Sequence, residues 1–195
     1  SFVFRLRDGI RWHDGEPLTV EDVVFTIRYF KKHPYRWVPM EAIAGAERRG
    51  PREVAVKLVT PYAPFLAYVG GTMPIIPKHI WEKVQDPRTF SSPEAFIGSG
   101  PFRFMDFSKA KGTYLFEANP DYFLGKPVVD RLIYVKAGKP LMTLLSGKAD
   151  LVNIKPDMAE PLRDRGMVVL ENQRGWNKKL MINHRKPPFN DRRFR

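Results

Sequence analysis

The chain is predicted to fold as a mixed α/β protein with α+β character. Three observations predict this class. Short segments in which apolar residues alternate with polar ones recur along the chain, residues 20–32 carry apolar side chains at helical spacing, and residues 131–154 show the order strand, helix, strand. At 43% hydrophobic and 13% aromatic residues, the chain can bury a core, so disorder over its whole length is excluded.

The first element is a strand over residues 2–7, where large apolar side chains alternate with a face rich in arginine. Asp8-Gly9 and Asp14-Gly15 predict turns, because Gly tolerates positive φ and Asp can bond its own downstream backbone. Thr19 is followed three residues later by Asp22, a capping-box pattern that begins a helix.

That helix is predicted from Val20 to Lys32, because its apolar residues form a single face at 3.6-residue spacing. His33-Pro34 ends it, since the residue before a proline is disfavoured in the α region. Residues 35–39 then form an aromatic loop. The alternation in Glu53–Val59 predicts the next strand.

Prolines and glycines shape the middle of the chain. Residues 61–77 predict a packed connection around a short helix, and residues 77–84 a second helix with Pro77 in its first turn. Residues 86–99 are predicted as loop with at most one helical turn. The character changes at the Gly-Ser-Gly-Pro turn of residues 98–101.

The second half alternates between strands and helices. Residues 102–107 and 113–118 predict a hairpin with a longer loop. Glycines are placed to end two short helices. The remaining predicted elements are helices at 140–146 and 158–165, and strands at 131–136, 149–154, 167–171 and 178–183.

The composition limits the classes of function. The formal charge of +12 (33 basic and 21 acidic residues) keeps a basic nucleic-acid-binding domain as the alternative function. Against it, the cations are scattered, and their densest run, residues 174–195, is interrupted by Pro187-Pro188 and apolar stretches. The absence of cysteine excludes disulfides and thiolate chemistry, and no apolar run is long enough to span a membrane.

Catalytic and metal-site patterns are weak. His13, Asp14 and Glu16 could form a metal or acid–base cluster, but turn chemistry alone accounts for the aspartate, and the four histidines lack the i, i+4 spacing of a helical zinc site. Ser99 lacks the five-residue pattern of a nucleophile elbow, and Pro101 bars the helix that should follow. We therefore expect no enzyme activity, no metal and no cofactor.

Five stretches, in order, resemble the family 5 extracellular solute-binding proteins, the peptide- and nickel-binding receptors of bacterial and archaeal ABC importers. The most specific is FRLRDGIRWHDGEPLTVEDVV at residues 4–24. The others are the glycine–proline turn at 98–102, NPDYFLGKPVVD at 119–130, LLSGKADL at 144–151, and residues 183–191 with KPPFND. The likeness spans nearly the whole chain.

The resemblance implies a periplasmic-binding-protein-like class II fold, present in part. Residues 1–98 would be a small subdomain inserted in lobe I, residues 99–182 part of the α/β domain of lobe I, and residues 183–195 the start of the crossover into lobe II. Family members typically run to more than twice this length, so both ends are expected to be cut.

The resemblance also implies a function: the substrate-binding component of an ABC importer, which captures peptides or a related small solute by lobe closure and delivers them to permease subunits. The implied location is extracytoplasmic, in the periplasm or on a cell-surface lipoprotein. It implies no cofactor, no nucleic acid and no transmembrane segment. Nickel, opine, haem and oligosaccharide ligands stay open, because one scaffold carries many functions.

The resemblance implies two groups of ligand contacts. Tyr35 and Trp37 would reach the ligand from the aromatic loop; the alternative is that they cap the core of the small subdomain. In the second group, an arginine and a lysine would pair with charges of the ligand, or would simply be solvated cations at a strand edge. Lys178 and its neighbour stand where many relatives carry tyrosines or small apolar residues, which leaves the ligand class open. The second group comprises Arg174, Trp176, Lys179 and Met181.

Overall fold

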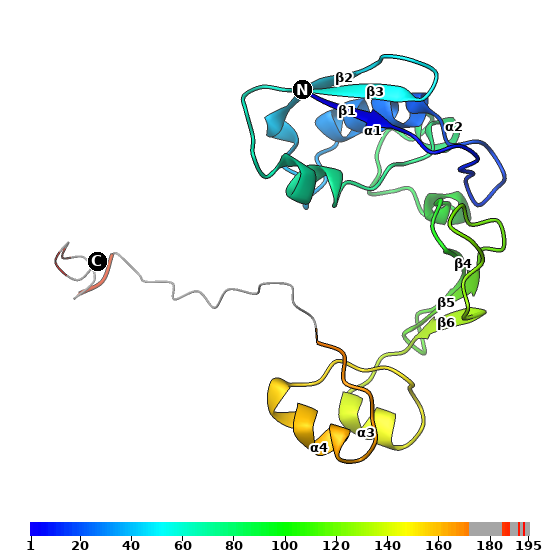
Figure 1. Cartoon of the computed structure of the whole chain (residues 1–195), viewed down its shortest axis with the longest axis vertical. Coiled ribbons are helices and arrows are strands. Elements are labelled where there is room, and N and C mark those ends of the chain that lie inside the picture. Colours follow the sequence, from blue (N-terminus) through cyan, green and yellow to red (C-terminus); the bar gives the residue numbers. More distant parts are fainter. Residues whose placement is uncertain (172–184, 188–190, 192, 194–195) are drawn as a thin grey trace. The chain divides into compact units, whose positions relative to one another are not determined.

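The structure is a computed structural model that describes residues 1–171, 185–187, 191 and 193. The chain divides into two compact units, Ser1–Lys136 and Ala137–Arg195, which we describe separately. Figure 1 shows the elements in chain order. Among the described residues, no helix has both the length and the apolar character needed to cross a membrane.

The first unit begins with a three-stranded antiparallel sheet in the order β1-β3-β2, formed by Phe2–Arg5, Glu53–Leu58 and Ile43–Arg48 respectively. The predicted strands at 2–7 and 53–59 are confirmed with slightly shorter bounds. Sequence analysis missed β2, because its Ala-Gly-Ala-Glu segment has low strand propensity. It forms because the central strand β3 offers a free edge, and the ladder pairs Ala46 with Val56.

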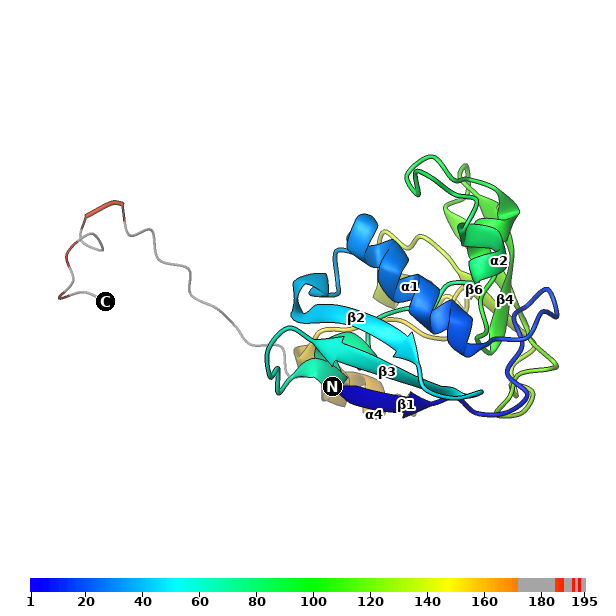
Figure 2. The same cartoon turned by 90° about the horizontal axis from the view of Figure 1, so that it is seen from above.

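Helix α1 spans Val20–Lys32, the predicted bounds, and lies across this sheet (Figure 2). The Thr19 backbone N–H donates to Oδ2 of Asp22 over 2.7 Å, so the predicted cap is confirmed. Asp22 is buried, and its Oδ1 accepts the backbone N–H of Lys78 over 2.8 Å. The cap therefore also joins the start of α1 to the start of α2, which sequence analysis did not foresee.

The core of the first unit lies between α1 and the sheet. Phe65 covers the part of this core next to β1, where its ring stacks on that of Phe2 with centroids 4.5 Å apart. Thr26 is fully buried, and its Oγ1 accepts the backbone N–H of Ile76 over 3.0 Å, so it anchors the proline-rich connection to α1. The fully or almost fully buried side chains here include Val20, Ile27, Ile43, Val54, Val56, Phe65 and Val69.

The connections carry single helical turns. They lie at Met40–Ala42, Leu66–Gly70 and Pro93–Phe96, the last two where short helical segments were predicted. Helix α2 covers only Lys78–Trp81, four residues of the predicted 77–84, and an irregular turn follows it.

A second antiparallel sheet of three strands, in the order β4-β5-β6, completes the first unit. Its strands are Phe102–Ser108, Thr113–Ala118 and Arg131–Tyr134, so the predicted hairpin and the strand after it are confirmed. Cross-strand register places Phe104 opposite Phe116, and Phe96 stacks on Phe104 with centroids 4.0 Å apart. One face of this sheet is therefore aromatic.

The second unit contains helices α3 (Pro140–Leu145) and α4 (Ala159–Arg163), the latter preceded by a turn at Pro156–Met158. Both predicted helices are confirmed, and the glycines that end them have φ of +68° and +75°.

The strands predicted at 149–154 and 167–171 are wrong, because the structure forms no ladder there. A strand is stabilised by pairing, and the described residues of this unit contain no strand to pair with. The strand–helix–strand order predicted for 131–154 is therefore not formed, and the strand predicted at 178–183 lies outside the described residues.

Candidate ligand-contacting residues and a polar junction

The aromatic loop after α1 presents its two candidate residues differently. Tyr35 lies against the helix and stacks on Phe30, with centroids 5.4 Å apart and an angle of 19° between the rings. Trp37 is 65% exposed, and the Arg36 guanidinium lies over its ring, 4.8 Å from the centroid. The loop is anchored by the buried Val38. Tyr35 therefore supports the loop, whereas Trp37 offers an aromatic face to whatever approaches it.

Further apolar side chains are exposed at the same end of the first sheet, where β2 begins and β3 ends. Val59 follows β3, and its backbone N–H donates over 3.0 Å to the carbonyl of Ala42, which ends the helical turn between the aromatic loop and β2. Leu66 and Tyr68 are exposed on the turn that follows Phe65. Trp37, Val59, Leu66 and Tyr68 are all exposed, and we call them together the apolar end of the first sheet. Such a surface can bind apolar or aromatic groups.

The remaining four sequence-predicted site residues lie outside the described residues, so the structure does not relate them to Tyr35 or Trp37. They are Arg174, Trp176, Lys179 and Met181.

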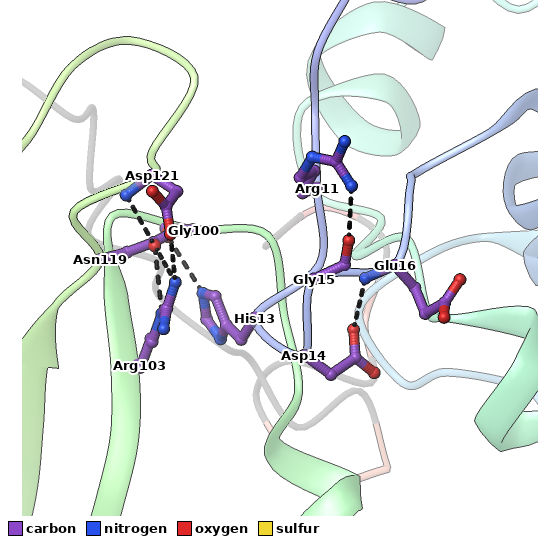
Figure 3. A network of polar contacts seen from close by, with 9 residues as sticks. All are labelled: Arg11, His13, Asp14, Gly15, Glu16, Gly100, Arg103, Asn119 and Asp121. Atoms are coloured by element: carbon purple, nitrogen blue, oxygen red, sulfur yellow. Dashed lines mark hydrogen bonds and ion pairs between the residues drawn. The ribbon is translucent and has the colours of Figure 1, made fainter.

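His13 belongs to a polar junction that links distant segments of the first unit (Figure 3). Its ring is held from both sides by the 98–101 turn: the Gly98 backbone N–H donates to Nδ1 over 3.2 Å, and Nε2 lies 3.0 Å from the Gly100 carbonyl oxygen. The His13 backbone N–H also donates to the Gly98 carbonyl over 2.8 Å. Because one nitrogen must accept and the other must donate, the partners assign a neutral ring with its proton on Nε2.

Asn119 and Arg103 complete the junction. Asn119 is buried, and its Nδ2 donates to the Gly100 carbonyl over 3.2 Å, so that carbonyl accepts from both Asn119 and His13. Arg103 donates to Oδ1 of Asn119 over 2.6 Å and to Oδ2 of Asp121 over 3.1 Å. The turn that sequence analysis identified by its glycines is thus fixed by side chains from both sides.

In the cluster of His13, Asp14 and Glu16, which resembled a metal or acid–base site, Asp14 makes contacts that stabilise a turn. Oδ1 of Asp14 accepts the Glu16 backbone N–H over 3.2 Å, as the predicted turn requires. Its Oδ2 lies 2.8 Å from Nε2 of His79, so the turn is tied to α2. Within the described ranges, no three His, Cys, Asp or Glu side chains lie close enough to hold a metal ion.

A cavity of about 740 Å³ opens beside the Asp14–His79 pair. Apolar side chains such as Ile80 and Phe90 line it together with charged ones of both signs, including Lys83 and Glu94. Sequence analysis missed it, because its walls come from the irregular segment 79–97, which carries no motif, and from Asp14, which lies far from that segment in the chain. Its charges do not select one class of ligand.

Comparisons with known proteins give a consistent result. The family model described as bacterial extracellular solute-binding proteins, family 5 Middle, matches residues 1–195. The oligopeptide-binding protein AppA of Bacillus subtilis is 34% identical over 142 residues, which cover 69% of this chain and 26% of AppA. The chain thus spans about a quarter of the length of this relative.

Solved structures are similar over part of their length. A periplasmic oligopeptide-binding protein from Thermotoga maritima matches with a TM-score of 0.71 and 27% identity, over 84% of this chain and 32% of that one. NikZ from Campylobacter jejuni, solved in complex with Ni(L-His), matches with a TM-score of 0.64 and 31% identity, over 75% of this chain and 30% of NikZ.

Proposed function

The chain belongs to the bacterial extracellular solute-binding proteins of family 5, and from this membership we propose that it is part of the substrate-binding component of an ABC importer, which captures a peptide or a related small solute. The resemblance seen in the motifs is confirmed by the match over residues 1–195. The predicted fold class, mixed helix and sheet of the periplasmic-binding-protein type, is confirmed by the similar solved structures. The match over the whole chain is the observation that carries the proposal.

A peptide is the ligand class that we put first. AppA is named as an oligopeptide-binding protein, whereas NikZ was solved with Ni(L-His). The apolar end of the first sheet supports a peptide, because exposed aromatic and aliphatic groups suit side chains of varied size. We propose that Trp37 contacts the ligand and that Tyr35 holds the loop in place. Arg174, Trp176, Lys179 and Met181 stay proposed contacts.

The proposed mechanism is lobe closure. A solute that bridges two lobes binds the closed form more tightly than the open form, and this difference in affinity shifts the population towards closure. The closed receptor then delivers the solute to the permease subunits, outside the cytoplasm, in the periplasm or on a cell-surface lipoprotein. No covalent step is needed, so we propose a binding function and not an enzyme.

The domain boundaries at 98/99 and 182/183 belong to this proposal. Residues 1–98 would be the small subdomain, residues 99–182 part of lobe I, and residues 183–195 the start of the crossover. Because the chain spans about a quarter of AppA, we propose that the 195-residue chain alone binds peptide weakly or not at all, whereas the full-length gene product binds it tightly.

Isothermal titration calorimetry tests the proposal. The full-length gene product is titrated with a tripeptide, a pentapeptide and the nickel–histidine complex, and the 195-residue chain with the same solutions. We expect saturable binding of a peptide by the full-length protein and none of comparable strength by the chain. Micromolar or tighter peptide binding by the chain alone would contradict the proposed division of the site, and saturation by nickel–histidine alone would replace peptide as the ligand class.

Two aromatic variants then test the proposed contact. Trp37→Ala is expected to weaken binding by the full-length protein about fivefold or more, since truncation of a central contact residue such as a tryptophan costs more than about 1 kcal/mol. The control is Tyr134→Ala, which removes a similarly exposed aromatic side chain from β6. If the two variants bound the peptide with equal affinity, Trp37 would not be a ligand contact.

A further inference from the structure

The His13 side chain joins the two sheets of the first unit at one point. The residue lies in the segment between β1 and α1, whereas its partners Gly98 and Gly100 lie just before β4. No other histidine in the described residues has both ring nitrogens paired with backbone groups. The contact therefore depends on the protonation state of the ring.

Only the neutral ring fits its partners. With the proton on Nε2, the ring donates to the Gly100 carbonyl, and its bare Nδ1 accepts the Gly98 N–H. A second proton would have to sit on Nδ1, where it would point at the Gly98 N–H. Two donors would then face each other at a contact that now measures 3.2 Å, so the bond to Gly98 is lost on protonation.

The groups around the ring do not compensate for a positive charge. Arg103, on β4, already places a guanidinium near the Gly100 carbonyl and repels a charged ring. The one nearby carboxylate, Asp14, favours the charged ring, but its two oxygens are engaged with the Glu16 backbone and His79. Asp121 is paired with Arg103 over 3.1 Å.

Burial adds to this effect. It lowers the pKa of His13 below the ordinary value of 6.5, and repulsion from Arg103 lowers it further. The bond to the Gly100 carbonyl and the charge of Asp14 act in the opposite direction without reversing the shift. The neutral form is thus the stable form of the folded protein at neutral pH.

We propose that His13 makes the junction between the two sheets sensitive to acid: the neutral ring holds the 98–101 turn at both Gly98 and Gly100, and the protonated ring loses its bond to the Gly98 N–H. The proposal is independent of the identity of the ligand. Protonation frees the Gly98 N–H, whereas the Nε2–H of the ring and Asn119 still donate to the Gly100 carbonyl and the His13 backbone N–H still donates to the Gly98 carbonyl. Acid below the folded-state pKa of His13 would therefore weaken the hold of this residue on the turn while each sheet stays folded.

The sign of the pH dependence follows from linkage. Because the folded-state pKa lies below 6.5, the unfolded chain binds more protons than the folded one in the window between the two pKa values. The contribution of His13 to stability is fully present above pH 6.5 and is lost as the pH falls through this window. Below the folded-state pKa there is no further loss from this residue.

Hydrogen–deuterium exchange of the whole chain tests the proposal. Rates are measured at pH 7.5 and at a pH below the folded-state pKa of His13, which the NMR titration described below gives, and are corrected for intrinsic exchange. We expect the Gly98 amide, which donates to the His13 ring, to lose protection at the lower pH, about tenfold or more, while the amides of α1 and β3 keep theirs. Unchanged protection at 98–101, or an equal loss throughout the first unit, would overturn the proposal.

Matched variants separate His13 from general acid effects. His13→Gln keeps a donor for the Gly100 carbonyl but cannot titrate, so the loss of protection on acidification should disappear. His33→Gln, which changes a histidine at the end of α1 away from the turn, should behave as the wild type does. If His13→Gln shows the same loss as the wild type, the ring is not the sensor.

A titration of the wild-type ring by NMR keeps the proposal testable even if the glutamine variant fails to fold. We expect the Nε2–H tautomer at pH 7.5 and a pKa below 6.5. An Nδ1–H tautomer, or a pKa above 6.5, would contradict the assigned hydrogen bonds.

Discussion

The two sheets of the first unit are of the same size but differ in what covers them. In the first sheet, Val54 and Val56 are completely or almost completely buried under α1 and Phe65. In the second sheet, Ile133 and Tyr134 remain exposed, and the aromatic contacts run mainly between neighbouring strands. Backbone pairing between strands forms both sheets, but only the first sheet is covered by a packed layer that buries its side chains. We therefore expect the stability of this unit to be concentrated in the first sheet.

The largest expected loss of stability comes from removing a buried side chain that packs between α1 and the first sheet. Ile27→Ala removes a fully buried side chain from α1, and Ile133→Ala removes the same atoms from an exposed site on β6. We expect Ile27→Ala to lower the free energy of unfolding by about 2–5 kcal/mol, because it leaves a cavity. Ile133→Ala is expected to cost under about 0.5 kcal/mol. Urea denaturation followed by circular dichroism measures both, and equal losses would contradict the contrast.

The next largest loss of stability is expected when the buried carboxylate of Asp22 is removed. Asp22→Ala leaves the backbone N–H groups of Thr19 and Lys78 without their acceptor, so we expect a loss of about 1–3 kcal/mol together with faster hydrogen exchange at Lys78. The control is Glu21→Ala, the exposed neighbour. If exchange at Lys78 stayed slow, Asp22 would act only as a helix cap.

In the second sheet, an aromatic pair replaces the missing cover. Phe104→Leu removes the stack on Phe96 and the edge contact with Phe116. Each such pair contributes about 0.5–1.5 kcal/mol, so local unfolding of residues 102–118, measured by hydrogen exchange, should become easier by about 1–2 kcal/mol. Met105→Leu, at an exposed neighbour on β4, should change little. A larger effect at Met105 would show that the other face is the covered one.

The smallest effect is expected in the second unit. Gly147 ends α3 with φ of +68°, a conformation that costs an alanine about 1–2 kcal/mol. The lower entropy of the unfolded alanine variant offsets about 0.4–1 kcal/mol. Gly147→Ala should therefore weaken hydrogen-exchange protection in α3 by about 0.5–1 kcal/mol, and Gly138→Ala, where φ is not positive and space is open, should not. Equal protection in the two variants would show that the positive φ of Gly147 does not contribute to the stability of α3.

Local patterns predicted the fold well where each element supplies its own signals. The bounds of α1 follow from Thr19, an apolar stripe and Pro34, all within the element or directly beside it. Strand β2 carries no such signal and exists because of the edge of β3. The opposite case is residues 149–154, where the sequence predicts a strand but the described residues of the second unit offer no partner strand.

The candidate site shows the same limit. The glycines and aspartates of the turns could be identified in the sequence, but the contact between His13 and the 98–101 turn spans 85 residues and has no local signature. For the aromatic loop, the resemblance named Tyr35 and Trp37 together, whereas the structure distinguishes them: the Tyr35 ring stacks on α1 and is 36% exposed, and Trp37 is 65% exposed. Residue type cannot make that distinction, because it depends on the position of Phe30.

Native mass spectrometry of the full-length gene product, purified without added ligand, tests most directly whether this chain is part of a solute receptor. We expect a fraction of the protein to carry a noncovalent adduct that is released on denaturation and is identified by fragmentation as a short peptide. A protein that carries no solute, and that takes up neither peptide nor nickel–histidine when these are added, would contradict the account.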